Sequence, residues 1–442
     1  MMQHFRLFAV ATAILILAAA GPAGAVEVKR VVSTAGIEAW LVEDHTNPVI
    51  TLRFAFRGAA ALDPKGKEGL ANLVSSTIDE GAGELDSKAF QGKLEDLAIT
   101  LRFSAGLDNF SGRLKTLVDN EDAAFGMLRL ALTKPRFDAE PLERIRTQIL
   151  SGLRQDEESP HTVASRTLFR QMFGDHPYGR PVDGTLKTVP TITAVELKRF
   201  VAERLGRDNL VIGVVGDITP KALAARLDQV FGALPAKAKD WRIPQATPVY
   251  SGGVTVKAKN VPQSAIMFTQ PGIRRDDKDF FAAYVVNHIL ADGSFTSRLY
   301  SEVREKRGLA YSVSASLWPL DWAALISGGA GTANARVKET IETVRAEWRR
   351  LVEGGIGSDE LKDAKTYLTG SFPLRFTSSG RIAGMLVGMQ LDELGMDYFE
   401  RRNAYVDAVT LADANRVAKQ LYDAAKLTFV VVGEPKGLPA TQ

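Results

Sequence analysis

Few side chains in this sequence could hold a catalytic metal ion. The chain has five histidines and no cysteine, whereas a catalytic zinc ion needs about three nitrogen, sulfur or carboxylate ligands and one open position. No two histidines stand four residues apart, the spacing that places two ligands on one face of a helix. His161 and His176 stand in the loop-like contexts SPHTVA and GDHPYG, and we interpret them as surface or capping residues. The histidines therefore predict no hydrolytic zinc site.

The stretch GLANLVSSTIDEGAG, residues 69–83, predicts an amphipathic helix. Apolar positions at i, i+3, i+4, i+7 and i+8 give a helix one buried face; here they are Leu70, Leu73, Val74, Thr77 and Ile78. Another face repeats the spacing with small polar residues, which are mediocre helix formers: Asn72, Ser75, Ser76 and Asp79. Asp79 and Glu80 could attract a cation weakly, but an acidic pair without histidine is a poor hydrolytic site.

A second stretch, SFTSRLYSEVREKRGLAYSVSASLW over residues 294–318, combines a helix pattern with a strand pattern. Ser294 or Thr296 could cap a helix that runs to about residue 307, and Gly308 supplies a C-terminal stop. The strand pattern AYSVSASL follows, and its alternation predicts that four side chains share one side of the strand: Tyr311, Val313, Ala315 and Leu317.

The first 25 residues predict a secretory signal peptide. Arg6 precedes an uninterrupted apolar run over residues 7–20, and Ala23-Gly24-Ala25 matches an A-x-A cleavage site. Spanning a bilayer takes roughly 20 apolar residues, so this run is short for a membrane anchor, although an uncleaved anchor stays an alternative. After cleavage no later apolar run approaches membrane-spanning length, and we expect no membrane span in the mature chain.

Two segments, residues 193–218 and 410–435, read as copies of one unit. Each has a threonine followed three residues later by an acid, which is an N-cap pattern, and then an apolar β-branched run that ends at glycine. Each copy closes one half of the chain, and the aperiodic stretch rich in proline, lysine and glycine between the halves predicts a linker. We therefore predict an α+β fold of two similar domains, residues 26–236 and 253–442, joined by a linker over residues 237–252.

Length and charge agree with this division and exclude one class of partner. A chain of 442 residues is too long for one ordinary core and suits two. Its formal net charge is +3, with basic and acidic residues interspersed, whereas a nucleic-acid-binding protein favours a concentrated basic face. We predict no nucleic-acid partner.

The segment SRLYSEVREKRGLAYSV strongly resembles the second domain of the pitrilysin-like or M16 zinc metallopeptidases. This family includes insulin-degrading enzymes, mitochondrial processing peptidases and many bacterial periplasmic proteins. The resemblance extends over essentially the whole chain after residue 25. It implies two similar domains, each a mostly antiparallel sheet packed with helices, that form a clamshell around a central cavity. Together with the signal peptide it implies a periplasmic location.

The resemblance also implies a role for Arg304 and Tyr311. In the family an arginine and a tyrosine from this segment form a pair that reaches across the cavity to the substrate backbone near the catalytic metal. A guanidinium group and a phenol both donate hydrogen bonds well to a peptide carbonyl or to the oxyanion it becomes during hydrolysis. Two plainer alternatives stay open: Arg304 pairs in solvent with Glu302 or Glu305, and Tyr311 is a half-buried strand tyrosine.

The same resemblance implies that this chain has lost its own zinc site. Active members carry the inverted motif H-x-x-E-H, in which two histidines bind zinc and the glutamate activates water. Alignment on the sequence Gly-Leu-Ala before the motif puts these three positions at Asn72, Ser75 and Ser76. The remaining ligand, a glutamate on a later helix, falls on Ser151-Gly152 within LERIRTQILSGLRQDEESP. We therefore expect this chain to bind no metal and to have no catalytic residue of its own.

Heterodimeric members of the family pair a zinc-bearing subunit with one that lacks the motif but keeps the arginine and tyrosine. The chain thus resembles the non-catalytic subunit of a periplasmic M16-type zinc metalloendopeptidase, with zinc in an H-x-x-E-H-containing partner and a peptide as substrate. A heterodimer or a dimer of heterodimers is expected. Residues 99–106 could accept a peptide by strand addition if they lie at a sheet edge, although they could equally be an internal strand.

Three other functions stay open from the sequence. The chain could be a stand-alone periplasmic peptide-binding or chaperone-like protein that uses the same cavity. It could be a structural assembly protein with no role in proteolysis. It could also be an autonomous zinc peptidase with rearranged ligands, which would require stoichiometric zinc in the lone protein.

Overall fold

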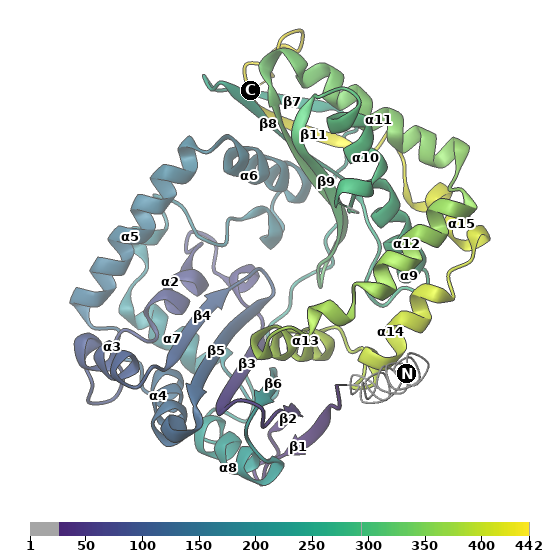
Figure 1. Ribbon diagram of the computed structural model, residues 1–442. Helices are drawn as coiled ribbons and strands as arrows, with labels where there is room; N and C mark the ends of the chain where they lie inside the picture. Colours follow the sequence, from purple (N-terminus) through teal and green to yellow (C-terminus); the bar gives the residue numbers. More distant parts are fainter. Residues whose placement is uncertain (1–25, 293, 442) are drawn as a thin grey trace, which may run out of the picture.

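The computed structural model describes residues 26–292 and 294–441, and within them the chain forms two β-sheets covered by helices, arranged as a clamshell (Figure 1). The predicted signal peptide, residues 1–25, lies outside the described residues. The α+β class and the two similar units are confirmed. We call the part that carries β1 to β6 the first half and the part that carries β7 to β11 the second half.

The first half contains six strands and seven α-helices in its described residues. The strands are β1 (Lys29–Val32), β2 (Glu38–Glu43), β3 (Val49–Arg57), β4 (Thr100–Ala105), β5 (Asn109–Leu117) and β6 (Leu210–Gly216). The helices are α2 (Leu70–Thr77), α3 (Ser87–Asp96), α4 (Glu121–Thr133), α5 (Ala139–Glu158), α6 (Pro160–Phe173), α7 (Ala194–Arg204) and α8 (Pro220–Phe231).

The second half contains five strands and seven α-helices in its described residues. The strands are β7 (Val254–Ala258), β8 (Gln263–Pro271), β9 (Ala310–Pro319), β10 (Ala324–Ala333) and β11 (Thr428–Gly433). The helices are α9 (Phe280–Asn287), α10 (Arg298–Tyr300), α11 (Val337–Gly354), α12 (Ser358–Gly370), α13 (Ser379–Leu391), α14 (Tyr398–Asp407) and α15 (Leu411–Leu421), with π-helical turns η5 (His288–Asp292) and η7 (Ser301–Glu305).

Apart from the additional edge strand β1 of the first sheet, the two sheets have the same topology, which confirms the internal duplication. The strand orders are β1-β2-β6-β3-β5-β4 and β7-β11-β8-β10-β9. In each sheet one pair is parallel, β2 with β6 and β7 with β11, and the other pairs are antiparallel. Both closing helices begin with the predicted capping box, Thr193 with Glu196 on α7 and Thr410 with Asp413 on α15. The β-branched runs that follow are β6 and β11, each at an inner position of its sheet.

Each half lends one helix to the sheet of the other half, an exchange that the sequence does not reveal. Helix α6 packs on β8 and β11, and helix α13 packs on β3 and β6. On the second sheet Leu168 of α6 is buried with Val430, and on the first sheet Leu386 of α13 is buried with Trp40. The hydrophobic interior therefore continues from one half to the other.

The segment between the halves, residues 237–252, contains no helix or strand. It is nevertheless held in place, because Ala246 N–H donates to the carbonyl of Trp322 at 2.9 Å and Val249 N–H donates to that of Met172 at 2.8 Å. The domain limits at residues 236 and 253 stay a prediction. Among the helices in the described part of the chain, none has both the length and the apolar character needed to cross a membrane.

Two predicted helices differ from the structure. The predicted buried stripe over residues 69–83 is confirmed, but the helix itself is shorter, since α2 ends at Thr77. The helix predicted to be capped by Ser294 or Thr296 is capped instead by Ser297, whose hydroxyl accepts a hydrogen bond from the N–H of Tyr300 at 3.3 Å. After one short α-helical turn the chain widens into η7, and the predicted stop at Gly308 has a φ of +58°.

Candidate functional site

The polar row on α2 is bonded to its own helix. The hydroxyls of Ser75 and Ser76 both donate to the carbonyl oxygen of Asn72, at 2.8 and 2.9 Å. Serine hydroxyls bond the preceding turn in this way when no other acceptor is within reach. On α5, which packs against α2, Ser151 and Gly152 are exposed. These five positions present hydroxyl, amide and backbone groups, and they include no imidazole or carboxylate.

The residues present do not fit a zinc ion. Across residues 26–292 and 294–441 there is no group of three histidine, aspartate or glutamate side chains that could hold a metal. Burial raises the pKa of Asp79 to about 6, so this carboxyl gives up its proton reluctantly. Glu80 is already paired with Arg144 at 2.6 Å and accepts a hydrogen bond from Ser87 at 2.5 Å. Of the acidic pair that follows α2, Asp79 is therefore buried and Glu80 is already engaged by other side chains.

Three of the four histidines in the described residues have separate structural contacts, and the fourth, His161, is an exposed residue that lines a cavity. His45 pairs with Asp217 at 2.6 Å, and that hydrogen bond raises its pKa. His176 accepts the N–H of Tyr178 at 3.1 Å on Nδ1 and lies 2.9 Å from the carbonyl of Pro244 through Nε2, an arrangement that fits a neutral capping histidine.

The other two histidines lie in helical segments. His161, predicted to stand in a loop, is the exposed second residue of α6, because Pro160 starts that helix at the position that proline favours. His288 lies in η5 with its ring stacked on that of Tyr367 at 5.0 Å, and burial lowers its pKa.

Arg304 and Tyr311 lie together on the surface of the second half. The guanidinium carbon of Arg304 is 4.5 Å from the ring centre of Tyr311 and 5.0 Å from that of Tyr300, which are cation–π distances. Tyr311 is 81% exposed. The alternative pairing of Arg304 with Glu302 does not form, because that carboxylate is bonded by Lys306, Arg307 and Arg350.

A β-bulge explains the exposure of Tyr311. Along β9 and β10, Val313 pairs with Ala330 and Ala310 pairs with Thr332, so two residues of β9 face the single residue Gly331. The extra residue shifts the alternation, and Tyr311 and Ser312 are both exposed while Val313 is buried. The prediction that Tyr311 shares one side with Val313 is therefore wrong. Bulges re-aim side chains in this way and are frequent beside functional sites.

Strands β4 and β9 form the free edges of the two sheets at equivalent places. The segment 99–106, which could have been internal, therefore lies at an edge. An edge strand has unpaired N–H and C=O groups that an extended peptide can bind. Part of this edge is covered from within the chain, since the Arg102 side chain donates to the carbonyl of Leu101 at 3.0 Å.

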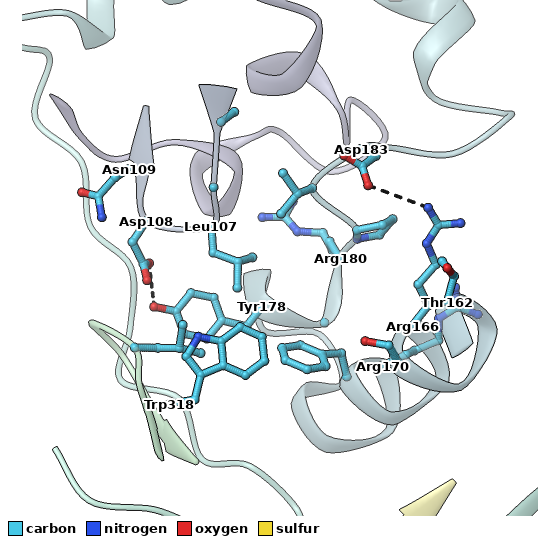
Figure 2. Close-up of a pocket in the computed structure, with 18 of the residues that line it drawn as sticks. Leu107, Asp108, Asn109, Thr162, Arg166, Arg170, Tyr178, Arg180, Asp183 and Trp318 are labelled. Atoms are coloured by element: carbon cyan, nitrogen blue, oxygen red, sulfur yellow. Dashed lines mark hydrogen bonds and ion pairs between the residues drawn. The ribbon is translucent and has the colours of Figure 1, made fainter. Parts of the chain in front are cut away.

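A cavity of about 700 Å³ opens beside the end of β4 (Figure 2). Its walls come from both halves: the end of β4 and the turn into β5, helix α6, residues 178–183, and Trp318 with Leu320 from the end of β9. At one side the hydroxyl of Tyr178 donates to Asp108 at 2.6 Å. The sequence analysis missed this cavity, because its lining comes from four separate segments that only the exchange of α6 brings together.

Comparison with known proteins shows which family model and which relatives this chain is similar to. The family model for the peptidase M16 inactive domain matches residues 191–368. The Helicobacter pylori protein named "Non-peptidase homolog YmxG" is 29% identical, over 89% of this chain and 91% of that protein. A Streptomyces coelicolor protein named "Uncharacterized zinc protease SCO5738" is 27% identical, over 79% of this chain and 73% of that protein.

Solved structures agree in fold and extent. The crystal structure of a peptidase M16 inactive domain from Pseudomonas fluorescens matches with a TM-score of 0.87 and 29% identity, and the match covers 94% of this chain and 99% of that chain. A protease from Helicobacter pylori matches with a TM-score of 0.82 at 19% identity, over 92% and 99% of the two chains, which shows the shared fold. Residues 191–368 therefore match the peptidase M16 inactive domain, and nearly the whole chain is similar in sequence and fold to the relatives and structures named above.

Proposed function

We propose that this protein is the non-catalytic subunit of a periplasmic M16-type zinc metalloendopeptidase, formed with a subunit that carries the H-x-x-E-H motif. One observation carries the proposal. The chain presents the half-buried Arg304 and the exposed Tyr311 side by side as two donors, while the motif positions on α2 hold only Asn72, Ser75 and Ser76. Such a chain can bind the substrate backbone, but it needs a partner for the hydrolytic group.

The environment of Arg304 supports a role in binding. Its guanidinium has no carboxylate partner in the described part of the chain, because Glu302 is taken by Lys306 and Arg307. Stacking on Tyr311 holds the guanidinium in place and leaves its N–H groups available in the plane of the group. A guanidinium and a phenol side by side can donate together to a peptide carbonyl, and in the proposed complex they would do so beside the zinc of the partner.

The free edge of the first sheet supplies a second contact for an extended peptide. A peptide that adds to β4 would gain main-chain hydrogen bonds without regard to its sequence. Signal-directed export would place this chamber in the periplasm, and pairing with the motif-bearing subunit would complete it as a heterodimer or a dimer of heterodimers.

The test is to mix the protein, without residues 1–25, with an H-x-x-E-H homologue from the same organism and with zinc. We expect a complex by size-exclusion chromatography and faster hydrolysis of a quenched fluorescent peptide than either protein gives alone. If neither a complex nor a change in hydrolysis is found, the subunit proposal fails.

Variants separate assembly from substrate binding. Arg304→Ala and Tyr311→Phe should preserve the complex and lower the hydrolysis rate about 100-fold or more, the typical effect of one lost donor to the transition state. Arg199→Ala, at an exposed arginine on α7, is the matched control. Wild-type hydrolysis by the mixed Arg304→Ala complex would remove the proposed role of the pair while leaving the assembly intact.

The cavity beside β4 favours a second candidate, a stand-alone peptide-binding protein, since a single chain closes this cavity. In that case the lone protein binds peptides with full affinity, and the motif-bearing homologue neither binds it nor changes that affinity.

A further inference from the structure

The cavity beside β4 combines an apolar wall with a basic wall. On the apolar side the ring centres of Trp318 and Phe169 lie 5.2 Å apart, and Trp318 is 40% exposed. Figure 2 shows Trp318 and Leu107 on one side of the cavity and the arginines of α6 and of the loop after Tyr178 on the other. A volume of about 700 Å³ is in the range of pockets that enclose a small ligand or a few side chains.

Three arginines form the basic wall, and they differ in how far they are neutralised. Arg166 bonds Asp156 at 2.8 Å and lies 3.9 Å from Asp183. Arg180 donates to two main-chain carbonyl oxygens, those of Asp63 at 2.7 Å and Ala61 at 3.1 Å. These carbonyls hold the side chain in place, but they do not cancel its charge.

Arg170 has no charged partner among the residues that the structure describes. It lies one helical turn beyond Arg166 on the same face of α6, it is exposed, and no ion pair or side-chain hydrogen bond engages it within the described residues. Of the two carboxyls that line the cavity, Asp183 faces Arg166, and Asp108 is buried with the Tyr178 hydroxyl on one oxygen. The cavity therefore offers an unpaired guanidinium across from an apolar wall.

The geometry points to a binding site for a carboxylate next to a large apolar side chain on a peptide, with the carboxylate on Arg170 and the apolar group against Trp318. This inference rests on the proposed function, in which an extended peptide adds to the β4 edge. Ser104 and Ala105 at the end of β4 also line the cavity. A peptide bound along the β4 edge would thus continue into it. A guanidinium binds a carboxylate through two parallel hydrogen bonds, while the apolar wall excludes water around them.

The experiment measures binding to the lone protein by fluorescence anisotropy. The probes are labelled, terminally blocked synthetic peptides that differ at one position, with Phe-Glu, Phe-Gln or Phe-Lys at the centre. We expect the Phe-Glu peptide to bind about tenfold more tightly than the Phe-Gln peptide, and the Phe-Lys peptide to bind most weakly. A fourth probe ends in Phe with a free carboxylate; if it binds more tightly than Phe-Glu, the ligand group is a chain terminus rather than a side chain, and the inference holds in that form.

Variants identify the cavity as the source of the preference. Arg170→Glu should reverse the order of the Phe-Glu and Phe-Lys peptides, and Trp318→Ala should weaken all peptides about tenfold without changing their order. The matched control is Arg154→Glu, at an exposed arginine on α5 outside the cavity, which should leave both order and affinity unchanged. Arg170 is exposed, so its replacement is compatible with folding.

Equal binding of the peptides, or an unchanged order in Arg170→Glu, would overturn the inference. These results are independent of the hydrolysis assay. A preference for acidic peptides without any partner-dependent hydrolysis would reject the subunit proposal and keep the site. Partner-dependent hydrolysis without that preference would reject only the site.

Discussion

Gly213 is a sensitive test of the helix exchange, because α13 of the second half packs directly on this residue of β6. A Cβ atom at Gly213 would lie 2.6 Å from the carbonyl oxygen of Ala383 and 2.7 Å from the Cβ of Leu386. Neither atom can move away by a change of rotamer. Gly213→Ala must therefore push α13 from the first sheet by several tenths of an ångström or more.

The expected cost has two parts. Overpacking of this kind costs about 1–3 kcal/mol. The displaced helix also carries carbonyl groups that bind the first half, since Arg57 donates to Gln390 at 3.2 Å and to Leu391 at 2.7 Å. The side-chain amide of Gln390 in turn donates to the carbonyl of Ile212 at 2.9 Å. Weakening one such bond adds about 1 kcal/mol, so we expect a total loss of about 2–4 kcal/mol.

Urea unfolding of Gly213→Ala, followed by circular dichroism, measures this loss. The matched control is Gly126→Ala within α4, where an added Cβ meets no heavy atom within 4 Å. The control should gain about 0.5–1 kcal/mol from helix propensity. If Gly213→Ala unfolds at the wild-type midpoint, α13 does not pack on the first sheet as described, and the argument for one continuous interior is wrong.

Three further predictions test local features of the structure. Burial raises the pKa of Asp108 to about 6, so the folded state binds this proton more tightly than the unfolded state. The contribution of this group to stability is complete below about pH 4 and is lost as the pH rises through 6. In the wild type this group should lower the free energy of unfolding by about 2 kcal/mol between pH 4 and 7, and Asp108→Asn should remove that decrease when unfolding by urea is measured across the same pH range. If the unfolding free energy of the variant depends on pH as it does in the wild type, the raised pKa of Asp108 is contradicted. Hydrogen bonds from Lys306 and Arg307 lower the pKa of Glu302 to about 2. Glu302→Gln should therefore lower the free energy of unfolding by about 1 kcal/mol at pH 7, a small loss because both partners are half-exposed. The difference in unfolding free energy between the variant and the wild type should shrink as the pH falls from 4.5 toward 2. Thr410→Ala removes a capping box and should cost about 1 kcal/mol; a thermal midpoint equal to that of the wild type would show that the cap contributes nothing.

Features specified by neighbouring residues were predictable from the sequence. The capping boxes of α7 and α15 and the strands after them depend on residues a few positions apart, and the buried stripe on α2 depends on a simple period. The duplication followed from comparing residues 193–218 with 410–435, and the shared topology of the two sheets confirms it.

Features that depend on distant partners were not predictable in this way. The alternation in AYSVSASL predicts that Tyr311 and Val313 share a side, but the register of β9 is set by β10, where Gly331 faces two residues. Helix α6 was not predicted, and nothing local in residues 160–173 specifies that this segment packs on β11. The cavity beside β4 depends on that packing, so it could not be found before the fold was known.

The loss of zinc ligands can itself be tested by restoring them. Asn72 and Ser76 stand four residues apart on α2, and both are half-buried, so Asn72→His and Ser76→His would place two imidazoles on one face. On the adjacent α5 the best position for a carboxylate is Gly152, which shares a helical face with Ile145 and Ile149 and where an added Cβ meets no heavy atom within 4 Å.

If only the ligands have been lost, the triple variant with Gly152→Glu should retain about one zinc ion per chain after dialysis. The double variant without Gly152→Glu should lose it, because two imidazoles alone make a weak site. Metal analysis by mass spectrometry distinguishes these outcomes. A triple variant that folds but retains no zinc would show that the separation of α2 and α5 has also changed, and that the scaffold of the site was lost together with its ligands.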